Sequence, residues 1–266
     1  MPARSWLDLT TEDFSTRDMG RAIALLPVAA VEQHGPHLPV GVDALIGQGY
    51  LARLTERVPE EIDLLVLPLQ AVGYSTEHTA FPGTLTLSLE TAVRTWIEIG
   101  EGVRRAGCRK LVVANSHGGN VAVIDAVARE LRLRGMLAVT ASWHRLGYPP
   151  GLFDAAELRH GIHGGEVETS LMLAFRPGAV KPEKTQDFVP RSVAMERDFK
   201  HLRPNHPVGF GWMAQDLHPA GAMGDAAAAS AAKGEAAAEF GVQAFVELLR
   251  EVDRFEVEGD ASPEER

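Results

Sequence analysis

The segment from Val31 to Asp43 gathers side chains that can bind a divalent metal ion. It reads V-E-Q-H-G-P-H-L-P-V-G-V-D and follows an apolar run directly. In an extended backbone alternate side chains point to the same face, so Glu32 and His34 are expected to share a pocket, with Cα atoms roughly 6.5 Å apart. The loop that follows is rich in glycine and proline, which allows Asp43 to fold back toward them. This segment therefore predicts three ligands of a metal site.

Two later motifs add candidate ligands. The motif N-S-H-G-G-N places His117 at the tip of an expected strand, where paired glycines let the backbone approach a ligand closely. The motif H-G-G-E-V-E-T-S begins at His163 and opens a helical pattern. If the helical turn already includes its first residue, the i,i+3 spacing puts His163 and Glu166 on one face and directs Glu168 elsewhere.

The predicted metal ligands combine carboxylates with imidazoles. They are Glu32, His34, Asp43, His117 and Glu166. This donor set suits zinc, manganese or iron better than a metal that prefers thiolates. With three carboxylates it can hold two divalent ions about 3.5–4 Å apart, with a water activated between them. The alternative is a solvated loop with scattered charges, in which His117 caps the helix that follows.

Alternating strands and helices are expected to position these motifs. Buried strands are predicted at residues 22–28, 63–69, 110–115 and 136–142, and helices at 43–56, 87–105, 121–134, 163–174 and 224 to about 252. This alternation predicts an α/β fold of three layers, with a doubly wound, mostly parallel sheet and helices on both faces. Ligands of such folds bind beyond the carboxyl ends of the strands, which is where the motifs lie.

The length of the chain is sufficient for a large buried core. With 266 residues, we expect one domain over residues 1–255, followed by a polar tail at 256–266. Residues 175–222 break the alternation and are expected to form a long excursion or lid. Its polar and aromatic residues are interpreted as parts of a charged surface loop rather than of the site; they include His206, Trp212, Asp216 and His218.

Composition limits the classes of partner and compartment. Hydrophobic residues make up 45% and charged residues 23%, as in ordinary globular proteins, and the net charge of −10 argues against nucleic acid as a partner. A single cysteine, Cys108, rules out an internal disulfide framework. The longest apolar stretch contains Pro27 and is shorter than the roughly 20 residues that span a bilayer. Because acidic residues stand where a signal peptide would be apolar, we expect a soluble, cytoplasmic protein acting on a small molecule.

Four motifs together resemble those of the creatininase family of metal-dependent amidohydrolases. They are E-Q-H-G-P-H-L-P-x-G-x-D at 32–43, E-H-x-x-F-P-G-T at 77–84, N-x-H-G-G-N at 115–120 and H-G-G-E-x-E-T-S at 163–170. A Gly-Asp pair at 224–225 before an Ala-rich helix is a weaker match, so the resemblance covers roughly residues 5 to 250. It implies a doubly wound α/β fold, two divalent ions per subunit, hydrolysis of a carbon–nitrogen bond and a homo-oligomer, often a hexamer.

The resemblance also implies a role for each ligand. The first ion would be bound by Glu32 and His117, the second by His34 and Glu166, and both would be bridged by Asp43. His163 would act as a proton shuttle, taking a proton from the metal-bound water and giving it to the leaving nitrogen, a task suited to an imidazole.

The chain departs from the creatinine-hydrolysing members at several positions. Gly118 and Gly119 stand where those enzymes carry an aromatic residue and a metal-binding Glu, so Glu166 is expected to supply the missing carboxylate. Ile162 replaces a Glu directly before the shuttle His, and of the substrate-stacking Trp residues only Trp143 remains. Creatinine itself is therefore not the expected substrate.

The expected substrate is a small, cyclic or formylated amide. Contacts with it are predicted at Ser75, Glu77, His78 and Trp143, although the first three could merely brace their loop and the last could pack in the core. Two alternatives remain open. One is a peptidase or cyclic keto-polyol hydrolase on the same scaffold, and the other is a metal-binding protein without catalytic activity.

Overall fold

A five-stranded parallel sheet forms the centre of the molecule. The computed structural model describes residues 4–205 and 208–256. The sheet has the strand order β1-β3-β2-β4-β5 and every neighbouring pair is parallel. Its strands are β1 (Arg4–Ser5), β2 (Ile23–Val28), β3 (Leu64–Val66), β4 (Lys110–Asn115) and β5 (Leu137–Ser142). The four strands predicted from apolar runs are confirmed, and the two-residue β1 is additional.

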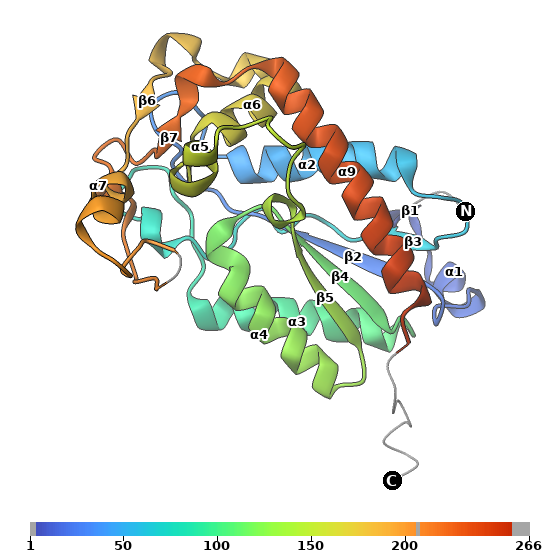
Figure 1. Cartoon of the computed structure of the whole chain (residues 1–266). Helices are drawn as coiled ribbons and strands as arrows, with labels where there is room; N and C mark the ends of the chain where they lie inside the picture. The colour runs from blue at the N-terminus through green and yellow to red at the C-terminus, as the bar shows by residue number, and fades with distance from the viewer. Residues whose placement is uncertain (1–3, 206–207, 257–266) are drawn as a thin grey trace.

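Helices cover both faces of this sheet, as Figure 1 shows. One face carries α2 (Val42–Arg57), α6 (Glu166–Phe175) and α9 (Ala231–Arg254), and the other carries α3 (Leu89–Arg105) and α4 (Val121–Leu133). The alternation of side chains along β2 divides the interior accordingly, because Ile23 and Leu25 pack in the core under the first group of helices and Ala24 and Leu26 pack in the core under the second. The predicted three-layer α/β fold is confirmed.

The long helix α9 begins later than predicted. Gly224–Asp225 form strand β7, and the Ser230 side chain caps α9 by accepting a hydrogen bond from the Lys233 backbone. Near its start, Gly234 lies so close to α6 that a Cβ would stand 1.9 Å from the Ser170 carbonyl oxygen. The glycine therefore allows α9 to pack directly on α6, the helix that carries part of the candidate site.

The excursion at residues 175–222 is folded from short elements. It contains β6 (Asp187–Phe188), α7 (Arg191–Asp198) and α8 (Ala214–Leu217), and β6 pairs antiparallel with β7. In Figure 1 these elements gather at the end of the molecule opposite to α1 (Thr11–Thr16), and α5 (Ala155–His160) lies next to them. The short helices α1, α5, α7 and α8 were not predicted, because segments of this length lack a recognisable hydrophobic period.

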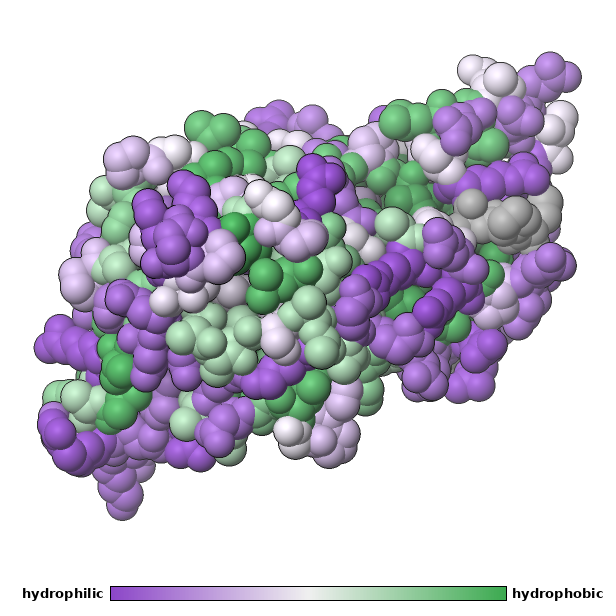
Figure 2. Space-filling view, turned by 90° about the horizontal axis from the view of Figure 1, so that it is seen from above, coloured by the Kyte–Doolittle hydropathy of each residue, from purple (hydrophilic) through white to green (hydrophobic). Residues whose placement is uncertain are grey.

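The surface carries no single dominant apolar area on the face seen in Figure 2, where hydrophobic residues form separate patches among hydrophilic ones. Scattered apolar side chains are ordinary on protein surfaces. None of the described helices is long and apolar enough to cross a lipid bilayer. Apart from Glu256, the predicted polar tail lies outside the described residues.

Candidate active site

A pocket of about 850 Å³ opens beyond the carboxyl ends of β2, β4 and β5. Its lining comes from segments that are far apart in the sequence and includes Glu32, Glu77, His78, His117, Trp143, His163, Glu168 and Trp212. The motif residues lie at this edge of the sheet, as the sequence predicted. At 850 Å³ the pocket lies within the usual range of small-molecule sites.

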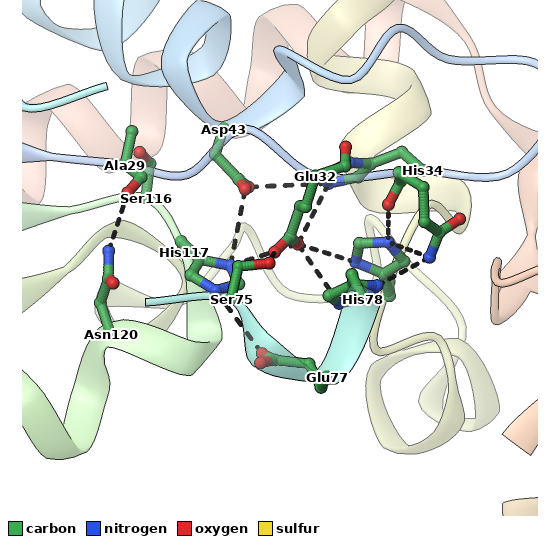
Figure 3. Close-up of polar contacts among 12 residues, drawn as sticks. Ala29, Glu32, His34, Asp43, Ser75, Glu77, His78, Ser116, His117 and Asn120 are labelled. Carbon is green, nitrogen blue, oxygen red and sulfur yellow. Dashed lines mark hydrogen bonds and ion pairs between the residues drawn. The ribbon is translucent and has the colours of Figure 1, made fainter. Parts of the chain in front are cut away.

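The carboxylate of Glu32 lies at the centre of the polar cluster at the base of this pocket (Figure 3). The Ser75 hydroxyl donates a hydrogen bond to its Oε2 atom, whereas its Oε1 atom is buried and has no hydrogen-bond partner among the described residues. Four imidazole nitrogens lie around Oε1, at 3.3 Å for His117, 3.4 Å for His78, 3.5 Å for His163 and 3.9 Å for His34. A buried oxygen that faces several potential ligands without a hydrogen bond is the arrangement expected around a cation.

His34, Asp43 and Glu168 form one group of potential ligands. Their ligand atoms lie within 4.8 Å of one another, and Nε2 of His34 is 3.6 Å from Asp43 Oδ1 and 3.7 Å from Glu168 Oε2. The Glu32 backbone supports this group twice, because its carbonyl accepts a hydrogen bond from His34 Nδ1 and its N–H donates to the Val40 carbonyl. The first bond leaves Nε2 to face the carboxylates, and the second closes the loop that returns Asp43 to the site.

Glu32, Glu77 and His117 form a second group. His117 Nε2 donates to the Tyr74 carbonyl at 3.1 Å, so its Nδ1 atom faces Glu32 and lies 3.5 Å from Asp43 Oδ2. Asp43 therefore reaches both groups. Glu77 approaches from the other side of the ring, with Oε1 3.6 Å from His117 Nε2.

Gly119 makes room for the carboxylate of Glu77. A Cβ on this glycine would stand 2.4 Å from Glu77 Oε1. Residue 119 is also where the resemblance placed a metal-binding Glu in other members. In this chain a carboxylate from the loop after β3 lies over that position, which the sequence had not indicated.

Two buried asparagines hold the His117 segment in place. Asn115, at the end of β4, accepts a hydrogen bond from the His117 backbone N–H and donates to its carbonyl. Asn120 donates to the Ala29 carbonyl and accepts from the Tyr74 N–H. These bonds connect the carboxyl ends of β2 and β4 with the loop that carries Glu77, so buried hydrogen bonds position the second group of potential ligands.

The structure corrects the expected placement of Glu166. Helix α6 begins at Glu166 and not at His163, because Gly164 has a φ of 62° and interrupts the turn. The Glu166 carboxylate forms an ion pair with Lys233 of α9, and it is Glu168 that lies against His34. The prediction that Glu166 joins the ligand cluster and that Glu168 points elsewhere was therefore wrong in geometry.

Of the four residues predicted to contact the substrate, three line the pocket and one does not. Glu77 and His78 line the pocket, whereas the Ser75 hydroxyl is occupied by Glu32 and is absent from the lining. Trp143 contributes to the lining but is only 4% exposed, since its ring stacks on Tyr50 with centroids 4.2 Å apart. It presents little surface to a ligand and is held mainly by core packing.

Trp212 was assigned to a surface loop, and the structure places it in the pocket lining. Its ring stands edge-on to His78 with centroids 6.5 Å apart, and its indole N–H donates to the Pro204 carbonyl. Asp216 caps α8 and His218 packs on Phe188, while His206 lies outside the described residues. A Trp beside a Phe-Gly pair in a long excursion was the only signal available in the sequence.

Charges in the cluster are mutually dependent. Burial lowers the pKa of His34, but Asp43 and Glu168 outweigh it and raise this pKa to about 9. Burial also opposes the charge of His117, yet Glu32 raises its pKa to about 10. Burial raises the pKa of Glu168 to about 7. Without a metal the carboxylates thus hold protons on the two imidazoles, and a divalent cation would replace those protons.

The other two imidazoles are neutral near pH 7. Burial lowers the pKa of His78 to about 4. Burial, followed by the charge of His34, holds the pKa of His163 well below its ordinary value. The site therefore combines two imidazoles that carry protons in the metal-free state with two that remain uncharged.

Comparison with proteins of known sequence identifies the family. The family model described as creatininase, creatinine amidohydrolase, matches residues 7–249. A creatinine amidohydrolase of Pseudomonas putida is 33% identical over 262 residues, covering 92% of this chain and 95% of the relative. A mycofactocin precursor peptide peptidase of Mycolicibacterium smegmatis is 32% identical, covering 80% and 78%. A 3-dehydro-scyllo-inosose hydrolase of Thermotoga maritima is 26% identical, covering 87% and 76%.

Solved structures agree with this result. A crystal structure of creatinine amidohydrolase superposes with a TM-score of 0.77 at 29% identity, covering 95% of this chain and 98% of that one. A structure named creatininase Mn gives a TM-score of 0.74 at 28% identity, covering 94% and 99%. The fold and the site define an α/β protein with a cluster of carboxylates and imidazoles at the carboxyl edge of its sheet. The chain belongs to the creatininase family, and it is a hydrolase of that family.

Proposed function

We propose that this hydrolase cleaves a carbon–nitrogen bond in a small cyclic or formylated amide, with the help of two divalent metal ions. One observation carries the proposal. Asp43 lies between two groups of potential ligands, with Oδ1 3.6 Å from His34 Nε2 and Oδ2 3.5 Å from His117 Nδ1. A carboxylate that reaches two such groups suits a bridging ligand of a dinuclear site.

Each proposed ion has its own set of ligands. Glu32, Asp43 and His117 would hold the first, with Glu77 adjoining, and His34, Asp43 and Glu168 would hold the second. One buried oxygen of Glu32 and one of Asp43 have no hydrogen-bond partner in the part of the chain that the structure describes, which fits a cation between them. Carboxylate and imidazole donors suit zinc, manganese or iron. Related structures are named creatininase Mn and a Zn–Zn form of a mutant creatininase.

When bound, such ions would polarise the substrate carbonyl and lower the pKa of a bound water. The chain's own residues would supply the remaining proton chemistry. His163 is neutral and buried, and its Nε2–H donates to the Gln33 carbonyl at 2.5 Å. Its Nδ1 lone pair therefore faces the cluster, where it can take a proton and pass it to the leaving nitrogen.

The pocket lining supports a small substrate with a flat, partly apolar surface. Trp212, Tyr148 and Trp143 contribute to the lining of the pocket. Aromatic side chains around a few polar groups are typical of small-molecule sites. A peptide end is the second candidate, supported by a volume of about 850 Å³ and by a relative named as a peptide peptidase.

A metal analysis combined with a substrate screen tests this proposal. Protein purified without chelators is expected to contain about two divalent ions per chain, and removal of the ions should abolish hydrolysis. Cyclic amides, formamides, short peptides and keto-inositols would be screened with the metal-loaded protein. Hydrolysis that persists with less than one ion per chain would refute the dinuclear site, and turnover of peptides alone would favour the second candidate.

His163→Ala separates a proton carrier from a ligand, because His163 Nδ1 also lies near Glu32 and His34. Hydrolysis is expected to fall by about 10²–10⁴-fold while both ions stay bound. Loss of an ion would make this residue a ligand instead.

Asp43→Asn tests the alternative that the protein binds metal without catalysing a reaction. If that alternative holds, this variant should have a lower melting temperature and no activity to lose.

We also propose that the protein is cytoplasmic and forms a homo-oligomer, with a hexamer as the expected state by family resemblance. Sedimentation velocity of the metal-loaded protein would measure the number of subunits. A monomer would contradict this part of the proposal without affecting the catalytic part.

A further inference from the structure

Gln33 lies between Glu32 and His34, and its side chain is held in one orientation. Its Oε1 atom accepts a hydrogen bond from the Gly35 backbone N–H at 2.9 Å, and its Nε2 atom donates to the Gly221 carbonyl at 3.0 Å. Backbone groups cannot exchange donor and acceptor roles, so the two ends of the amide are distinguished. Gly221 has a φ of 79°, and a Cβ there would stand 2.2 Å from Oε1.

The second N–H of Gln33 determines where the proton of His78 lies. Gln33 Nε2 is 2.7 Å from His78 Nδ1. Because Nε2 of the amide is a donor, Nδ1 must accept, and the single proton of the neutral ring is on its Nε2 atom. That atom lies 3.4 Å from Glu32 Oε1, on a ring that lines the pocket. His78 therefore presents an N–H to the site.

His163 has the opposite arrangement. Its Nε2–H is directed at the Gln33 carbonyl, so it presents the bare Nδ1 atom, 3.5 Å from Glu32 Oε1. The rings of His78 and His163 are stacked, with centroids 4.2 Å apart and an angle of 30° between their planes. One residue, through its backbone and its side chain, thus sets one imidazole as a donor and its neighbour as an acceptor.

We propose that Gln33 is a positioning residue that fixes the tautomer of His78, and that the His78 Nε2–H donates a hydrogen bond to the carbonyl oxygen of the amide under attack. As water adds to the carbonyl carbon, the electron pair of the C=O bond moves to oxygen, and this N–H stabilises the resulting charge. His78 keeps its proton throughout, and the proton of the attacking water goes to His163. The donor role rests on the proposed function, whereas the tautomer does not.

Nitrogen NMR of the protein labelled with ¹⁵N-histidine tests the tautomer directly, because protonated and bare imidazole nitrogens resonate in separate ranges. The zinc-loaded protein would be used, with His78 assigned from its absence in the His78→Gln spectrum. We expect a protonated Nε2 and a bare Nδ1. A protonated Nδ1 with a bare Nε2 would overturn the proposal whatever reaction the enzyme catalyses.

Paired variants test the donor role with an amide found in the substrate screen. His78→Leu is expected to lower kcat by about 10²–10³-fold, as for loss of a donor to a developing oxyanion, with the metal content unchanged. His78→Gln should recover most of that loss, because a Gln amide N–H extends to about the position of the imidazole Nε2. Wild-type kcat in His78→Leu, or equal losses in the two variants, would overturn the donor role.

Gln33→Met removes the amide at similar side-chain length, and Gln70→Met is its control. Gln70 is half-buried, does not line the pocket, and its side-chain amide donates a hydrogen bond to the Pro68 carbonyl. Gln33→Met should lower kcat about tenfold or more with KM within about twofold, and it should show both His78 tautomers by NMR, while Gln70→Met should change neither. A single unchanged tautomer in folded Gln33→Met would show that Gln33 does not set it. If no amide is hydrolysed but the tautomer is as expected, the proposed function and the donor role fail together and the positioning role stands.

Discussion

Replacing the two carboxylates of α6 with amides, one at a time, distinguishes the proposed metal ligand from the residue that forms an ion pair beside it. Glu168→Gln removes the charge 3.7 Å from His34, whereas Glu166→Gln removes the partner of Lys233. Both amides keep the volume of the side chain. We expect Glu168→Gln to weaken the binding of one ion and Glu166→Gln to leave both ions bound.

The expected size of the effect follows from linkage between binding and folding. An ion at 100 times its Kd stabilises the folded state by about 2.7 kcal/mol, and a 100-fold weaker site at the same concentration contributes only about 0.4 kcal/mol. Each kcal/mol shifts Tm by about 2–4 °C in a domain of this size. In Glu168→Gln, the Tm increase caused by that ion should fall from about 5–10 °C to about 1–2 °C.

Glu166→Gln should act on the metal-free protein instead. A hydrogen bond to a charged group contributes about 1.5–3 kcal/mol, but the Lys233 side chain is 33% exposed and solvent screens the pair. Because the amide oxygen can still accept a hydrogen bond from Lys233, we expect a loss of about 1 kcal/mol, or about 2–4 °C in Tm. The increase in Tm on adding metal should be unchanged.

Scanning calorimetry of chelator-treated protein, with zinc or manganese added back, measures both quantities. Metal content after gel filtration gives the number of ions retained. If Glu166→Gln abolished the metal-dependent increase in Tm and Glu168→Gln preserved it, Glu166 would be the ligand and our account of how α6 begins would be refuted.

Three further predictions concern protons, packing and the pocket. The raised pKa values of His34 and His117, about 9 and about 10, keep both rings largely protonated up to pH 8.5 in the metal-free protein, whereas Glu168, with a pKa of about 7, is largely ionised above pH 7.5. Binding of two ions should therefore release about two protons between pH 7.5 and 8.5, and the combined association constant, measured by calorimetry, should rise about 100-fold per pH unit there. A flat profile would contradict this. The stability that the same two groups give the metal-free protein is complete below pH 6.5 and is lost as pH rises through 9 to 10, so its Tm should fall over that range. Gly234→Ala would place a Cβ 1.9 Å from a carbonyl oxygen of α6. We therefore expect the free energy of unfolding, measured with urea, to fall by about 1–2 kcal/mol, even though Ala has the better helix propensity. Gly178→Ala, whose Cβ would meet nothing described within 4 Å, should cause no loss. Trp212→Leu should raise KM about two- to tenfold, because it removes an aromatic contact worth about 0.5–1.5 kcal/mol. The metal content should not change. An unaltered KM would show that Trp212 does not contact the substrate.

The central elements could be predicted because their signals are local. Strand β4 has the predicted bounds, Lys110–Asn115, since a buried parallel strand is a short apolar run bounded by polar and turn-forming residues. Glu32 and His34 meet in one cluster, with Oε1 and Nε2 3.9 Å apart, as their spacing by two residues predicted, although only Glu32 lines the pocket. Strand β1 has only two residues and pairs with β3, which lies about 60 residues later in the sequence, so no local pattern predicts it.

The parts that could not be predicted depend on contacts distant in sequence. Glu77 lies over Gly119 because the loops after β3 and β4 meet at one edge of the sheet. Trp212 lies near His78 because the excursion folds back over that edge. Both Glu166 and Glu168 satisfy a helical pattern near His163, and only the position at which the helix begins decides between them.

Together with Gly164, Glu157 of α5 fixes that position, and no motif in the sequence singles this residue out. Its buried carboxylate accepts hydrogen bonds from the Glu166 N–H at 2.7 Å and from the Asp225 N–H at 2.9 Å. The first of these satisfies an N–H at the start of α6 that has no partner within the helix. A Cβ on Gly165 would stand 2.3 Å from the same carboxylate, so this segment can approach it only as glycine. With the start of α6 fixed at Glu166, the residue two positions later is the one that lies against His34. A carboxylate outside the proposed ligand groups thus decides which Glu of α6 faces the proposed metal site.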